Sequence, residues 1–194
     1  MGTMDVDDRG AAEAPRFSLV SDRVPTPERF RCLVVGLSEL GPVTEDAPSD
    51  ALEFSSAELF ALADAQRSFE LVCVVTDAPM ERVLAAEERL ASLFEDSALP
   101  ANLRVLPVAT VPDAYSARQA VLSMLLYQKG MRLNDCVAVS CSAYDREMAF
   151  SCGRLLALRD AGPEVCAAAD ATFGPRRLDG LVRALRAASE VARG

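Results

Sequence analysis

Residues 135–148 read DCVAVSCSAYDREM. The run Cys136 to Val139 is apolar, as is typical of a strand buried on both faces of a parallel sheet. The small polar residues after it indicate a turn that opens a helix. A strand, turn and helix in this order place side chains such as Asp145 above the carboxyl edge of a sheet, where ligands bind in open α/β folds. This stretch therefore predicts an α/β fold with a site at that edge.

Further segments of the same kind lie on both sides of this stretch. Short apolar runs predict strands over residues 30–35, 69–75, 103–108, 136–139 and 154–158. Helices are expected over residues 55–66, 80–94, 114–129, 146–152 and 178–191, with a short one after Pro163. Strands that alternate with helices predict a doubly wound (Rossmann-like) parallel sheet with right-handed crossovers.

The chain of 194 residues has room for one such domain. Residues 1–29 are acidic and rich in Gly, Ala and Pro, which predicts a disordered or loosely packed arm. Residues 30–194 carry the strand and helix patterns and are expected to form the α/β domain.

Charge and composition narrow the function. The net charge is −9, which disfavours nucleic acid and anionic membranes as partners. The chain contains no His, which excludes Ser-His-Asp catalysis and imidazole metal sites. No run reaches the ~18 apolar residues of a membrane span. The six Cys occur without a C-x-x-C pair and are expected to be buried free thiols in a reducing compartment, so a cytoplasmic protein is predicted.

Several segments that follow the predicted strands carry a family resemblance. They contain, in order, Gly36 and Ser38, then Thr76, then Ala117 and Arg118, then Cys141 and Asp145. In order and spacing the segments resemble the four signatures of the haloacid dehalogenase-like phosphatases. The resemblance covers roughly residues 30–190, and it is closest to the sucrose-phosphate phosphatase type and the C-terminal domain of plant sucrose-phosphate synthases.

The resemblance implies a role for each position. The nucleophilic and the acid–base Asp of the family fall on Gly36 and Ser38, which can supply neither function. The phosphate-binding hydroxyl falls on Thr76, for which a simple helix cap is the alternative.

The remaining two signatures are also incomplete. The basic residue falls on Ala117, with Arg118 one position late and expected to be an exposed helical arginine. The metal-binding acidic pair is reduced to Asp145, since Cys141 is a poor ligand for Mg²⁺. We therefore expect no metal and no cofactor.

The cap domain of sugar-phosphate phosphatases is expected to be absent, because only a short loop joins the predicted helix 80–94 to the strand at 103. Taken together, the lost side chains predict a catalytically inactive domain that is not an enzyme. It would act as a binding, regulatory or scaffolding module for a protein partner, such as an enzyme of carbohydrate metabolism, or for a sugar phosphate. The alternative is a weak Mg-dependent sugar-phosphate phosphatase that uses Asp145 and Ser38.

Overall fold

The computed structural model describes residues 27, 29–37, 53–94, 99–108 and 114–194. The predicted arm, residues 1–29, lies outside these ranges except for Pro27 and Arg29. Within them, no helix combines the length and the apolar character that crossing a membrane requires.

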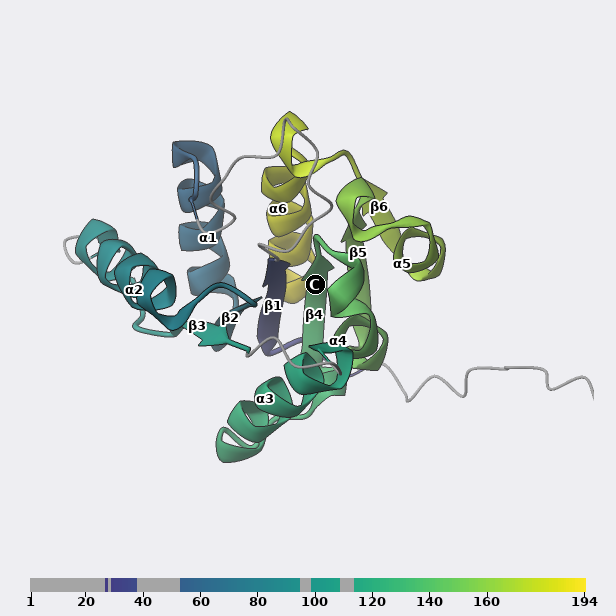
Figure 1. The fold of residues 1–194 in the computed structure, drawn as a ribbon, viewed down its shortest axis with the longest axis horizontal. Coiled ribbons are helices and arrows are strands. Elements are labelled where there is room, and N and C mark those ends of the chain that lie inside the picture. The colour runs from purple at the N-terminus through teal and green to yellow at the C-terminus, as the bar shows by residue number, and fades with distance from the viewer. Residues whose placement is uncertain (1–26, 28, 38–52, 95–98, 109–113) are drawn as a thin grey trace, which may run out of the picture.

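A parallel sheet of six strands forms the centre of the molecule, in the order β3-β2-β1-β4-β5-β6 (Figure 1). The strands are β1 (Cys32–Leu37), β2 (Leu71–Thr76), β3 (Leu103–Pro107), β4 (Cys136–Ser140), β5 (Arg154–Leu158) and β6 (Ala171–Phe173). The α-helices are α1 (Ser56–Ser68), α2 (Met80–Phe94), α3 (Ala114–Gln128), α4 (Arg146–Ser151), α5 (Pro163–Ala168) and α6 (Gly180–Arg193). The predicted doubly wound α/β fold is confirmed.

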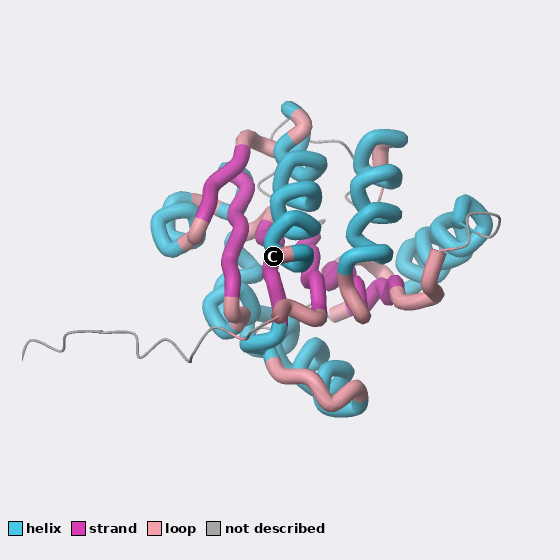
Figure 2. Tube along the Cα trace, turned by 180° about the vertical axis from the view of Figure 1, so that it is seen from behind, coloured by secondary structure: helices cyan, strands magenta, loops and turns pink. Residues whose placement is uncertain are grey.

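Helices cover the sheet on both faces. On one face α1, α2 and α6 pack against alternate strand residues such as Leu33 and Val74, and α1 and α6 run side by side there (Figure 2). On the other face α3 and α4 cover the intervening strand residues, including Val34 and Cys73, and α4 and α5 cover β5. The central strands are buried on both faces, which explains why their sequences are continuous apolar runs rather than alternating ones.

Local signals in the sequence set the ends of several helices. Ser55 caps α1 by accepting a hydrogen bond from the backbone N–H of Glu58, whose carboxylate accepts one in return from the N–H of Ser55. Gly130 follows α3 with a positive φ of 64°, a conformation that glycine adopts without strain. The strand β6 was not predicted, because it has only three residues, of which Thr172 is exposed and two are half-buried, and they form no long apolar run.

The connections define where a ligand site is expected. From β1 the chain passes through α1 to β2 on one side, whereas α3 carries it from β3 to β4 on the other side of β1. The carboxyl ends of β1 and β4 therefore border the point at which the strand order reverses, and open α/β sheets bind ligands there. Only residues 95–102 join α2 to β3, in agreement with the expected absence of a cap domain at this connection.

Leu185 in α6 tests this packing. Its side chain is fully buried in the cluster beneath α1 and α6, so Leu185→Ala should lower the free energy of unfolding by about 2–5 kcal/mol in urea denaturation. Leu178 is 64% exposed, and Leu178→Ala should change it by less than about 0.5 kcal/mol. Equal losses for the two variants would contradict the assigned core.

Candidate functional site

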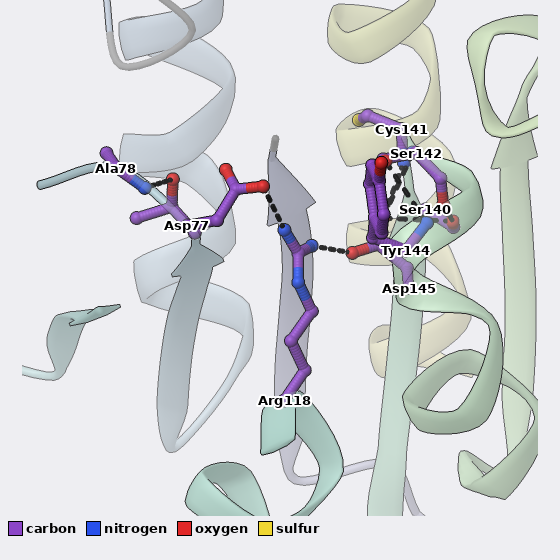
Figure 3. A network of polar contacts seen from close by, with 9 residues as sticks. Asp77, Ala78, Arg118, Ser140, Cys141, Ser142, Tyr144 and Asp145 are labelled. Carbon is purple, nitrogen blue, oxygen red and sulfur yellow. Dashed lines mark hydrogen bonds and ion pairs between the residues drawn. The ribbon is translucent and has the colours of Figure 1, made fainter. Parts of the chain in front are cut away.

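Three charged side chains meet at the carboxyl edge of the sheet, where the strand order reverses (Figure 3). Asp77 follows β2 directly, Asp145 lies in the turn after β4, and Arg118 extends from α3 between them. The side chains of Asp77, Arg118 and Asp145 are 5%, 1% and 0% exposed. We name these three residues the switch-point cluster.

Arg118 joins the two carboxylates. Its Nη1 contacts Oδ1 of Asp145, and its Nη2 lies 3.2 Å from Oδ2 of Asp77. Despite this ion pair, Nη2 makes no hydrogen bond of good geometry. Buried donors are nearly always satisfied, so a guanidinium with unused N–H capacity marks a place for a further acceptor.

Asp145 is held in place by the turn after β4. Its Oδ2 accepts hydrogen bonds from the Ser140 hydroxyl at 3.1 Å and from the backbone N–H groups of Cys141 at 3.2 Å and Ser142 at 3.1 Å. The Ser142 hydroxyl in turn accepts from the N–H of Tyr144 at 3.2 Å, which completes a capping box over residues 142–145. The carboxylate is therefore oriented by its own turn as well as by Arg118.

Burial sets the protonation behaviour of this turn. Desolvation raises the pKa of Asp145 above its usual value, and the charge of Arg118 and the hydrogen bonds from Ser140 and Ser142 oppose this rise. Burial also raises the pKa of the Cys141 thiol far above its usual range, with the negative charge of Asp145 adding to it. Cys141 is therefore a neutral thiol at pH 7 and offers no thiolate.

Gly36, near the end of β1, faces Asp145 directly. A Cβ atom placed on Gly36 would lie 2.2 Å from Cγ of Asp145 and 2.3 Å from both of its carboxylate oxygens. The Asp145 carboxylate thus fills the space in which a side chain at position 36 would begin. The family resemblance assigned the missing nucleophile to position 36, and the structure places a carboxylate from the turn after β4 at that same spot.

The other predicted positions have different outcomes. Thr76 is buried, and its hydroxyl accepts a hydrogen bond from the N–H of Ala78 at 3.1 Å, a local turn contact that lies before α2 begins at Met80. Ala117 is half-buried against the apolar cluster beneath α3. Ser38 lies outside the described residues.

The expectation that Arg118 is an exposed helical arginine was wrong. Arg118 precedes the buried residues Leu122 and Leu126 by one and two helical turns, so the three side chains share the inward face of α3. This i, i+4, i+8 spacing was the sequence signal for its burial. Asp77 was also missed as a site residue, because the second signature position falls on its neighbour Thr76.

Comparison with solved structures identifies the fold. A HAD (haloacid dehalogenase) family hydrolase from Streptomyces avermitilis matches with a TM-score of 0.56 and 19% identity over 84% of this chain and 87% of that one. A 3-deoxy-D-manno-octulosonate 8-phosphate phosphatase from Moraxella catarrhalis, in complex with magnesium, phosphate and its sugar, matches at 0.57 and 11% identity over 84% and 88%. No protein-family model and no curated protein sequence matches the chain. The protein therefore has the HAD-like α/β core.

These neighbours correct two expectations. The prediction that the chain is not an enzyme is contradicted, because the structures that share its fold are named as HAD hydrolases and phosphatases. The prediction rested only on the side chains missing from the signature positions. The predicted closeness to sucrose-phosphate phosphatases finds no support among the neighbours, which include octulosonate 8-phosphate phosphatases.

The magnesium ion of the Moraxella catarrhalis phosphatase does not fit the side chains that the structure describes at this edge. Among the described residues, no three His, Cys, Asp or Glu side chains group around a common point. Both oxygens of Asp145 already accept hydrogen bonds, and a guanidinium stands between it and Asp77. Mg²⁺ requires near-octahedral oxygen ligation, which these groups do not offer.

Substitution of Gly36 tests the geometry of the site. Gly36→Ala should destabilise the protein by about 1–3 kcal/mol, because the new methyl group overlaps the Asp145 carboxylate, which its donors hold in place. Gly174→Ala is the control, since its methyl group would meet nothing closer than 3.9 Å. Chemical denaturation measures both, and a neutral Gly36→Ala would show that Asp145 lies elsewhere.

Proposed function

We propose that this chain hydrolyses phosphate monoesters at the switch-point cluster. The observation that carries the proposal is the buried Arg118 at the reversal of strand order. Its Nη2 lies 3.2 Å from Oδ2 of Asp77 but makes no hydrogen bond of good geometry. Guanidinium groups bind phosphate oxygens through paired, charge-assisted hydrogen bonds. The fold is shared with named phosphatases, which supports this choice of substrate.

Asp145 is the candidate nucleophile. Arg118 can turn from Oδ1 of Asp145 to a phosphate oxygen, because its fork of N–H donors suits either anion. The freed Oδ1 attacks phosphorus, an aspartyl phosphate forms, and the alcohol leaves with a proton taken from water. Water then attacks the phosphoryl group, which releases inorganic phosphate and restores the carboxylate. The hydrogen bonds to Oδ2 keep the carboxylate aligned throughout.

The connection between α2 and β3 is too short to contain a cap domain, which favours a substrate that the core alone can hold. A sugar phosphate meets this requirement through its phosphate group, so we propose a small phosphorylated sugar as the substrate class. A protein partner from carbohydrate metabolism and a cytoplasmic location stay predictions. The weak phosphatase named as the alternative is thus the activity we propose, without the dependence on Mg²⁺.

Hydrolysis of p-nitrophenyl phosphate tests the proposal, since its leaving group departs without an enzymic acid. The wild-type protein should release p-nitrophenol above the blank rate, and Asp145→Asn should lower kcat by at least about 100-fold, as expected on loss of a covalent nucleophile. Glu164→Gln, an exposed carboxylate paired with Arg146, should leave the rate unchanged. Absence of wild-type turnover on this ester and on sugar phosphates would refute the function.

The pH profile gives a second test. Burial raises the pKa of Asp145, and only its ionised form attacks phosphorus, so kcat/KM should fall as the pH drops through a pKa above the usual value of about 3.9. Activity is therefore lost on the acid side and retained above it. Stopped assays across acidic buffers measure the profile, and an acid limb at or below the usual value would contradict Asp145 as nucleophile.

A further inference from the structure

The switch-point cluster is an unusual arrangement of buried charge. Asp77 and Asp145 come from the ends of different strands, and both are nearly or fully excluded from solvent. Two carboxylates brought this close in a poorly solvated site repel each other and require a cation. In this protein Arg118 supplies the charge, with one nitrogen directed to each carboxylate.

Both carboxylate oxygens of Asp145 already have hydrogen-bond donors. Its Oδ2 accepts three hydrogen bonds, and its Oδ1 contacts Arg118. A carboxylate offers about four lone-pair positions, so little remains for coordination to an ion. In the wild type a metal could bind Asp145 only by displacing Arg118 from Oδ1, or the donors of residues 140–142 from Oδ2.

The charge balance of the cluster also disfavours a divalent ion while Arg118 is present. The two carboxylates and the guanidinium together carry a net charge of −1, and a bound Mg²⁺ would change it to +1 at a site removed from water. Without the guanidinium, the carboxylates alone carry −2, which Mg²⁺ would neutralise. The side chain at position 118 thus decides whether the cluster attracts a divalent ion.

We propose that the Arg118 guanidinium is the built-in cation of this site, in place of the divalent ion that accompanies phosphate in relatives of the same fold. The inference deepens the proposed function and rests on it for its meaning in catalysis, but its test is a binding measurement. A covalently attached cation cannot be chelated or exchanged. It also presents N–H donors to an anion, whereas an ion presents open coordination positions.

Removal of the guanidinium should convert the cluster into a divalent-ion site. We would titrate Mn²⁺ into the wild type, Arg118→Met and Arg146→Met, and record thermal unfolding in EDTA and in Mg²⁺. Arg146 is a matched control, since it is an exposed arginine that pairs with Glu164 near the same edge. The wild type and Arg146→Met should bind Mn²⁺ only weakly and should unfold at the same temperature in EDTA and in Mg²⁺. Arg118→Met should bind Mn²⁺ at least tenfold more tightly than the wild type does, and it should unfold at a higher temperature in Mg²⁺ than in EDTA.

The possible outcomes separate this inference from the proposed function. Binding of Mn²⁺ by the wild type as tight as by Arg118→Met would overturn the inference. So would an Arg118→Met protein that stays unfolded even in Mg²⁺, because the ion should then replace the lost charge. Arg118→Lys, which keeps a cation, should fold and ignore Mg²⁺. Wild-type turnover that requires Mg²⁺ would also overturn the inference while leaving hydrolysis intact, and absence of turnover with the expected ion binding would refute only the proposed function.

Discussion

The contact of Arg118 with two buried carboxylates is the interaction on which the carboxyl edge of this protein depends. The guanidinium and the two carboxylates lose most of their hydration when the protein folds, and desolvation of each ion costs several kcal/mol. Their mutual attraction offsets this cost only while all three remain in contact. The pairing therefore ties the end of β2, helix α3 and the turn after β4 into one unit, although these segments are far apart in the sequence.

The glycine in β1 follows from this interaction. The Asp145 carboxylate reaches across from β4 and fills the space above Gly36, so position 36 has no room for a side chain while the turn keeps its shape. The edge thus holds a carboxylate where the resemblance to phosphatases requires one, but the turn after β4 provides it instead of β1. Comparison of the signature positions alone suggests that the nucleophile has been lost. In the structure, the carboxylate of Asp145 occupies that place and contacts the buried Arg118.

The sequence predicted the layout of the fold because its signals are local. Continuous apolar runs marked the five strands β1–β5, and Ser55 with Glu58 gave the start of α1. The strand β6 was missed because its three residues, one exposed and two half-buried, are too few to show a hydrophobic pattern. At the site, Asp145 was recognised from its turn. The burial of Arg118 and the role of Asp77 were missed, since they depend on how α3 and the end of β2 meet across the sheet. The helical spacing from Arg118 to Leu126 held part of that information.

The interaction energy between Arg118 and Asp145 tests the account most directly. It is obtained from a double-mutant cycle, in which the free energy of unfolding is measured for the wild type, Arg118→Met, Asp145→Asn and the double variant. A buried pair that holds the edge together predicts a coupling of about 2 kcal/mol or more, because each single change leaves the other charge buried with fewer partners. Additivity within about 0.5 kcal/mol would show that the two residues do not depend on each other, and it would contradict the account.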